Sequence, residues 1–192
     1  YHLLTMIDEA HATGVIGKTG HGTVEHFGNT VLPDILMGTL SKALGAEGGY
    51  ACAGKVIIEY LKNKARSFIF ATSQTPATLA AALRATEVLE EEPQRAQKLQ
   101  HNVEFFLNAL HAEGVEAYSP TAIIPIIIGD EKSALQVADE LLANGVLAPA
   151  IRYPTVAKGT ARLRVALMAT HTEAELSQTA KLIGAAIRKY KK

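Results

Sequence analysis

The sequence of 192 residues lacks several features that mark common classes of protein. It contains no tryptophan and a single cysteine, Cys52. One cysteine excludes a disulfide framework and an all-cysteine zinc site, and it suits a reducing compartment, so we expect a cytoplasmic protein. No apolar run reaches the ~18 residues of a membrane-spanning helix. The longest run, Ala122 to Gly129, is interrupted by Pro125.

The sequence also lacks an excess of either charge. The 19 basic residues balance the 19 acidic ones, which removes the electrostatic argument for a nucleic-acid or membrane partner. Of all residues, 48% are hydrophobic and 20% are charged. This composition is typical of a globular protein with a substantial core and excludes a disordered chain.

A polar lead-in is missing as well, because the chain begins directly with the apolar stretch Leu3–Ile7. A near-continuous apolar strand is what a parallel sheet buried on both faces requires, and such a strand needs neighbours. We therefore expect the C-terminal half of a larger fold, present as a truncated, processed or nicked chain. We expect this half to be inactive on its own.

The first part of the sequence alternates short apolar strands with glycine-rich connections, a pattern typical of α/β units. The expected strands are Leu3–Ile7, Asp34–Gly38, Gly49–Ala53 and Phe68–Ala71. A helix is predicted over Lys55–Lys64 from its apolar stripe. Thr75 and Pro76 predict the start of a further helix, which Pro93 interrupts. A second helical run follows, and Gly114 ends it.

The pattern after Gly114 is α+β. Strands are expected over Ile123–Ile128, Val146–Ile151 and Leu163–Met168. Asp130 is expected to cap a helix with the apolar face Leu135, Ala138, Leu141 and Leu142. Thr172 and Glu175 form a capping-box pair at the start of the last helix. The sequence thus predicts two domains, residues 1–92 and residues 93–192.

Asp8-Glu9-Ala10-His11 is the first candidate for chemistry, because Asp8 follows a predicted strand and sites in α/β sheets gather at such ends. One alternative is a turn cap with a surface histidine. Another is the acidic box of helicase-type ATPases, which requires a phosphate-binding loop. Gly17-Lys18-Thr19 imitates the end of that loop, but it lacks the first glycine and follows the acidic motif instead of preceding it.

The second candidate is Lys42, within Gly38-Thr39-Leu40-Ser41-Lys42-Ala43-Leu44-Gly45. Lysine among apolar residues is rarely buried unless it is paired or chemically used. We expect Lys42 to be sheltered, because desolvation keeps an amine neutral and nucleophilic. A strand-end carboxylate, an imidazole, a loop rich in hydroxyls and a sheltered lysine together suit pyridoxal 5'-phosphate (PLP).

These motifs, in this order, resemble the α-oxoamine synthases, PLP enzymes of the fold-type I aminotransferase superfamily. The resemblance extends over the whole chain, through Gly48-Gly49-Tyr50, Phe70-Ala71-Thr72-Ser73, Pro154-Thr155-Val156, Ala161-Arg162-Leu163-Arg164 and His171-Thr172. It implies an α/β fold: half of a mainly parallel-sheet large domain that binds PLP, followed by a small α+β C-terminal domain.

The resemblance also implies a role for each matching residue. Asp8 is expected to contact the pyridinium nitrogen and His11 the ring hydroxyl. Thr39, assisted by Ser41, is expected to bind the phosphate, and Lys42 to form the Schiff base. Thr72 is similar to a hydroxyl that reaches the phosphate of the neighbouring subunit in a homodimer, although Ala71 stands where serine is often found. The substrate-side residues implied are Arg164, which resembles the arginine that binds the amino-acid carboxylate, and the weaker candidates Arg152, Thr155 and Arg162.

The reaction implied is the condensation of an amino acid with an acyl-CoA thioester, with loss of CO2 and CoA. Gly14-Val15-Ile16-Gly17, Gly20-His21-Gly22 and Glu25-His26-Phe27-Gly28 most resemble the branch that joins alanine to a pimeloyl thioester in biotin biosynthesis. The close alternative is the branch that uses glycine and acetyl-CoA. A non-catalytic fragment is a further alternative. One observation argues against it, namely the joint presence of Asp8, His11, Lys42 and Arg164.

Overall fold

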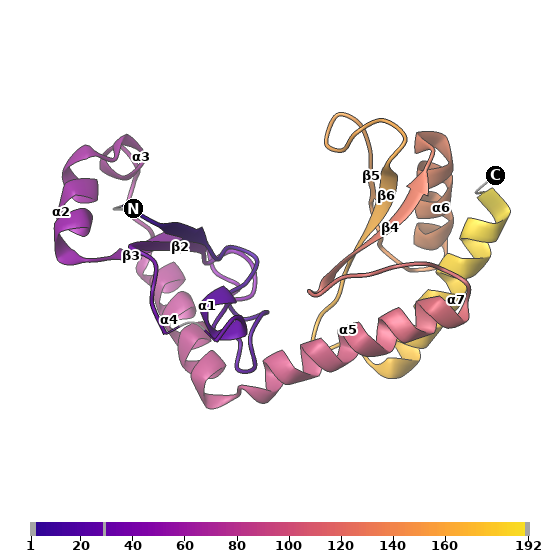
Figure 1. The fold of residues 1–192 in the computed structure, drawn as a ribbon, viewed down its shortest axis with the longest axis horizontal. Coiled ribbons are helices and arrows are strands. Elements are labelled where there is room, and N and C mark those ends of the chain that lie inside the picture. The colour runs from indigo at the N-terminus through magenta and orange to yellow at the C-terminus, as the bar shows by residue number, and fades with distance from the viewer. Residues whose placement is uncertain (1–2, 29, 191–192) are drawn as a thin grey trace. The chain divides into compact units, whose positions relative to one another are not determined.

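The computed structural model describes residues 3–28 and 30–190 (Figure 1). The chain divides into two compact units, Tyr1–Gln97 and Lys98–Lys192. The boundary lies inside helix α5 (Gln94–Ala112), a few residues after Pro93. Within the described ranges, no helix combines the length and the apolar character needed to cross a membrane.

The first unit contains a sheet of three strands, in the order β1 (Met6–Asp8), β2 (Ile35–Thr39) and β3 (Gly49–Ala53). β1 and β2 are parallel, with Asp8 opposite Met37. β2 and β3 are antiparallel, with Thr39 opposite Gly49. The carboxyl ends of the two parallel strands therefore lie at one edge of the sheet, together with the loop that joins β2 to β3.

Four helices accompany this sheet: α1 (Thr23–His26), α2 (Lys55–Lys64), α3 (Arg66–Ile69) and α4 (Pro76–Glu91). The expected bounds of α2 are confirmed. Thr75 caps α4 as predicted, because its hydroxyl oxygen accepts a hydrogen bond of 3.2 Å from the Thr78 backbone amide. α4 ends at Glu91 and α5 begins at Gln94, so Pro93 separates them.

The predicted strand Phe68–Ala71 is wrong. The segment begins inside the short helix α3, where the amides of Phe68 and Ile69 both bond to the Ala65 carbonyl and the Phe70 amide bonds to Arg66. A strand needs a neighbouring strand to accept its amide protons. Here the preceding turn accepts them instead, and Phe68 and Phe70 stay largely exposed, at 63% and 74%.

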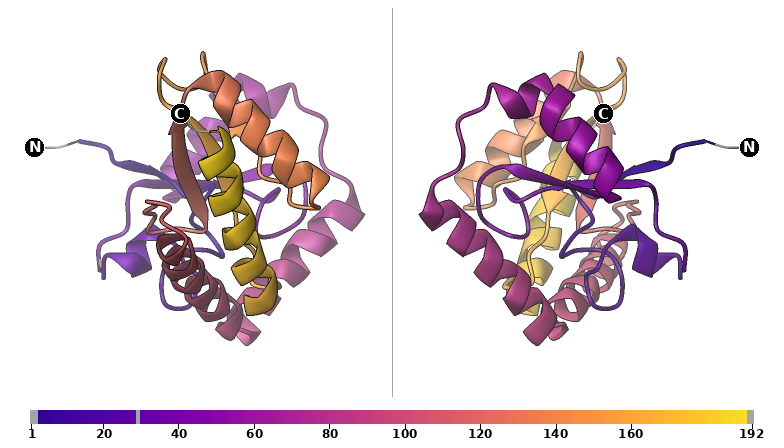
Figure 2. Two further views of the ribbon diagram at one scale, coloured as in Figure 1. Left: turned by 90° about the vertical axis from the view of Figure 1, so that its right-hand side faces the viewer. Right: turned by 90° about the vertical axis from the view of Figure 1, so that its left-hand side faces the viewer.

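The second unit packs helices against one face of an antiparallel sheet. The strands β4 (Ile123–Gly129), β6 (Ala161–Ala166) and β5 (Ala150–Ile151) are adjacent in that order. α6 (Glu131–Ala143) contacts β4, β6 and α7 (Glu173–Tyr190), and Figure 2 shows α6 and α7 side by side. The centre of the unit is fully buried and includes Phe106, Leu110, Ile124, Leu163 and Ile183.

Three details of this unit differ from the sequence predictions. β5 is shorter than Val146–Ile151, because the Val146 amide still bonds to Leu141 at the end of α6. β6 begins and ends two residues before Leu163–Met168. α6 buries the stripe Ala134, Val137 and Leu141, whereas Leu135 and Leu142 are exposed. The apolar face that meets the sheet is thus turned by one position from the predicted one at Ala134 and Leu135.

Candidate active site

The turn after β1 carries Asp8 and His11. The carboxylate oxygen Oδ1 of Asp8 accepts a hydrogen bond of 2.8 Å from the Ala10 amide. The amides of Ala12 and Thr13 both bond to the Glu9 carbonyl at 2.9 and 3.0 Å. These bonds close a compact turn at the sheet edge, and the side chains of Asp8 and His11 are both exposed on it.

The loop after β2 carries the hydroxyls and the lysine. The Thr39 hydroxyl lies 2.9 Å from the Gly48 carbonyl, to which it donates, and 2.8 Å from the Ser41 hydroxyl. The Leu40 amide bonds to the same Gly48 carbonyl at 2.9 Å. The loop thus closes on itself at the edge that Asp8 occupies, and it holds the two hydroxyls together.

Lys42 lies on this loop, but the expectation that it is sheltered is wrong for this chain. Lys42 is exposed, whereas Leu44 is the side chain of the loop that is buried, at 7%. The Gly45 amide bonds to the Lys42 carbonyl at 3.0 Å, so Lys42 begins a tight turn. Apolar neighbours in sequence do not cover a lysine when the turn directs them to the opposite side.

Glu9 is a residue whose part in this edge the sequence reasoning missed. It is 1% exposed, and its carboxylate accepts hydrogen bonds from the Thr23 amide at 3.0 and 3.1 Å and from the Thr23 hydroxyl. A buried carboxylate occupied in this way is not available to activate water. The helicase-type interpretation of Asp8-Glu9-Ala10-His11 therefore fails at Glu9.

Tyr50 also supports the turn, and sequence reasoning gave it no role of its own. Tyr50 lies opposite Gly38 in the β2–β3 pairing, and its ring crosses the space that a side chain at Gly38 would fill. Its hydroxyl reaches that of Thr13 at 2.9 Å. A glycine paired with an aromatic residue across two strands is a signal that could have identified the packing of Tyr50 over Gly38.

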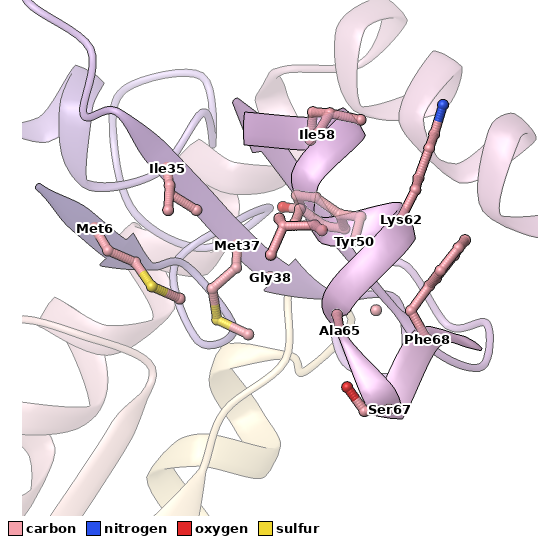
Figure 3. Close-up of a pocket in the computed structure, with 13 residues that line it drawn as sticks. Met6, Ile35, Met37, Gly38, Tyr50, Ile58, Lys62, Ala65, Ser67 and Phe68 are labelled. Atoms are coloured by element: carbon pink, nitrogen blue, oxygen red, sulfur yellow. The ribbon is translucent and has the colours of Figure 1, made fainter. Parts of the chain in front are cut away.

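An apolar hollow of about 650 Å³ lies between the sheet of the first unit and the helices α2 and α3. Figure 3 shows Met6 and Met37 extending from the sheet and Phe68 from α3. None of the site residues expected from the sequence lines it. The hollow borders the edge that carries Asp8 and Thr39, because Met37, Gly38 and Gly49 line it.

Thr72 lies, exposed, in the segment between α3 and α4. Two residues later, the Gln74 side chain occupies the space where a side chain at Gly48 would lie. Gly48 has a φ of +103°, a conformation that favours glycine. The segment that follows Thr72 therefore packs against the loop of Lys42.

The second unit contains the substrate-side candidates. Arg164 alternates on β6 with the buried residues Leu163 and Val165, and it is exposed on the opposite face, as expected. Arg162 shares that face, but its Nε donates a hydrogen bond of 3.0 Å to the Thr160 carbonyl. Arg152 and Thr155 are exposed in the loop after β5, where the Thr155 amide bonds to the Arg152 carbonyl at 3.0 Å.

Comparison with known proteins gives a consistent result. A family model described as aminotransferase class I and II matches residues 1–183. Among curated proteins, the chain is 48% identical over 184 residues to 8-amino-7-oxononanoate synthase 1 of Bacillus subtilis (strain 168), covering 95% of this chain and 47% of the relative. The chain spans about half the length of the curated relatives it matches.

Solved structures also match, and two examples each cover 96% of this chain. One is 8-amino-7-oxononanoate synthase from Francisella tularensis, with a TM-score of 0.84, 31% identity and 55% of that chain covered. The other is a serine palmitoyltransferase from S. paucimobilis with a bound PLP–myriocin aldimine, with a TM-score of 0.88, 27% identity and 47% of that chain covered.

Proposed function

Because this chain belongs to the aminotransferase class I and II family, we propose that it supplies one half of the active site of a PLP-dependent α-oxoamine synthase. The reaction is that of 8-amino-7-oxononanoate synthase: alanine condenses with a pimeloyl thioester, with loss of CO2 and of the thiol carrier, in biotin biosynthesis. The likeness to relatives of that name supports this choice. The observation that carries the proposal is the convergence of Asp8, Thr39 and the Lys42 loop at one sheet edge.

The residues at this edge fit PLP in their chemical type. They offer a carboxylate, an imidazole, two neighbouring hydroxyls and a primary amine. Within residues 3–28 and 30–190, neither the Lys42 amino group nor the His11 ring is engaged in a hydrogen bond or ion pair. When bound, PLP supplies an electron sink for the α-carbon of the amino acid.

Each side chain then has a defined task. The Asp8 carboxylate holds a proton on the ring nitrogen by its charge. His11 binds the ring hydroxyl, and the hydroxyls of Thr39 and Ser41 bind the phosphate. Lys42 Nζ would hold the cofactor and would take the proton from the α-carbon of the amino acid.

Residues of the second unit and of the segment before α4 complete the proposal. Arg164 binds the amino-acid carboxylate through its planar guanidinium, with Arg152 and Thr155 on the same substrate. The exposed hydroxyl of Thr72 contacts the phosphate bound by the partner subunit of a homodimer. The active site would thus require both an upstream half and a second copy.

The lysine assignment is tested by trapping. The chain is combined with the upstream half of the Bacillus subtilis relative, loaded with PLP and reduced with borohydride. Peptide mapping is expected to find the pyridoxyl group on Lys42. A label on Lys18 or Lys55 instead would refute the assignment.

The substrate pair is tested with the same assembly. Alanine with pimeloyl-CoA is expected to react faster than glycine with acetyl-CoA. The reverse preference would assign the chain to glycine C-acetyltransferase, and turnover of neither pair, with a relative's intact enzyme active in parallel, would contradict the synthase function.

A further inference from the structure

The geometry points to Glu9 as a positioning residue, whose buried carboxylate fixes the Asp8–His11 turn by holding the backbone at Gly22 and Thr23. This inference rests on the proposed function, in which Asp8 and His11 of this turn bind PLP. It goes beyond that function because Glu9 makes no contact with a substrate or cofactor in the proposal.

The carboxylate of Glu9 is enclosed by the segment it holds. Both of its oxygens lie within 3.1 Å of the Thr23 amide nitrogen, and one also accepts from the Thr23 hydroxyl. Gly22 has a φ of +88°, and a methyl group there would overlap Glu9 Oε2. A carboxylate that is 1% exposed is costly to bury without such partners, and the Thr23 amide and hydroxyl supply them.

The position of Glu9 in the chain links these contacts to the site. Its amide donates to the Met37 carbonyl at 2.7 Å, which extends the pairing of β1 and β2 past Asp8, and its carbonyl accepts from Ala12 and Thr13. The backbone of Glu9 is therefore the base of the turn, and its side chain anchors that base to residues 22 and 23. Asp8 and His11 lie on either side of this anchor.

Glu25 offers a matched control in the same glycine-rich segment. Its carboxylate accepts from the amide and hydroxyl of Thr19 and from the His21 amide, so it makes bonds of the same kind to a threonine. These bonds stay within residues 19–25, and His21 of this segment pairs with Thr13 in an isolated bridge. Loss of this carboxylate should loosen the segment and its pairing with Thr13, and it should leave residues 9–12 as they are.

The experiment compares four variants of the chain assembled with the upstream half of a relative: Glu9→Gln, Thr23→Val, Thr23→Ser and Glu25→Gln. Amide hydrogen exchange is measured without cofactor, and PLP affinity is measured by the absorbance of the bound cofactor. Thr23→Val removes the hydroxyl donor at nearly constant shape, and Thr23→Ser keeps it.

Glu9→Gln and Thr23→Val are expected to accelerate exchange at residues 9–12 and to weaken PLP binding about tenfold, as for the loss of a hydrogen bond to a charged group. Thr23→Ser should restore both values, and Glu25→Gln should change neither. Parent-like exchange and affinity in Glu9→Gln and Thr23→Val would overturn the inference. Asp8→Asn, measured alongside, separates the two ideas: unchanged PLP affinity in that variant counts against the proposed function instead.

Discussion

Two adjacent carboxylates at the end of β1 have opposite surroundings. The Asp8 carboxylate is exposed and accepts a bond from the Ala10 amide of the turn that follows it, whereas Glu9 is enclosed by Gly22 and Thr23. Successive side chains of an extended segment point to opposite faces, so one residue is available to a ligand and the next to the interior. Asp8 is therefore the candidate for contact with the cofactor, and Glu9 is the candidate for holding the turn in place.

Replacement of Asp8 by asparagine tests the proposed role of this carboxylate in catalysis. The amide keeps the shape of the side chain but cannot hold a ring proton by charge, so turnover should fall by about two orders of magnitude. Steady-state kinetics of the PLP-loaded assembly give the rate, and far-ultraviolet circular dichroism checks the fold. Near-parent turnover would remove Asp8 from the proposed role.

Arg164→Lys tests the substrate side. Lysine keeps the charge but loses the bidentate fork, so the KM for the amino acid should rise about tenfold, while the KM for the acyl-CoA should change little. Arg162→Lys is the matched control, because Arg162 lies on the same face of β6 but already donates to Thr160. An unchanged amino-acid KM in Arg164→Lys would direct attention to Arg152.

At the scale of elements, helix α6 depends on the residue that caps its N-terminus. Asp130 accepts hydrogen bonds from the Ser133 amide at 2.8 Å and hydroxyl at 2.9 Å. These bonds, the backbone one first, hold the pKa of Asp130 below its ordinary value of 3.8. A carboxyl with a lower pKa in the folded state stabilises the fold above its unfolded pKa, and this contribution is lost as the pH falls through the folded pKa.

Asp130→Ala should therefore lower the melting temperature by several degrees at pH 7, with the deficit shrinking as the pH falls below 3.8. Thermal unfolding followed by circular dichroism across this range measures the effect. Asp139→Ala, an exposed position on the same helix, should leave the melting temperature nearly unchanged. An equal deficit at every pH would show that the charge of Asp130 plays no part.

Elements with local signals were predictable from the sequence, and those that depend on partners were not. The helix α2 and the caps at Thr75 and Asp130 follow from short-range pattern and turn chemistry. The segment Phe68–Ala71 has the apolar content of a strand, but its amides bond within α3. Composition alone cannot show which acceptor a backbone amide will find.

The same limit applies to the candidate site. Asp8 and Thr39 could be assigned to one sheet edge because parallel strands end together. The exposure of Lys42 and the burial of Glu9 depend on how two loops fold back, which no periodicity records. The element that carries each candidate residue was thus predictable, and the surroundings of each side chain were not.

At the scale of the molecule, the first unit presents an unusual amount of apolar surface. Leu3, Leu4 and Met6 are 75%, 77% and 61% exposed, and Leu79 and Leu83 on α4 are 53% and 62% exposed. Large apolar side chains that stay exposed suit contact with another polypeptide. The exposure of Leu3, Leu4 and Met6 agrees with the expectation that the first strand needs neighbours.

The 192-residue chain alone should therefore show no synthase activity, and co-expression with the upstream half of a relative should restore it. Size-exclusion chromatography with light scattering is expected to report a dimer of the complete assembly. Robust turnover by the isolated chain, measured after removal of any co-purified protein, would contradict this expectation.

The overlap between Gly22 and Glu9 has a consequence for how this sequence can diverge. A methyl group at position 22 would overlap Glu9 Oε2, so the carboxylate would have to move away from Thr23 to make room. A side chain gained at position 22 would therefore weaken the bonds between Glu9 and Thr23, in addition to the strain of a φ of +88°. Divergence at position 22 is thus coupled to the carboxylate of Glu9.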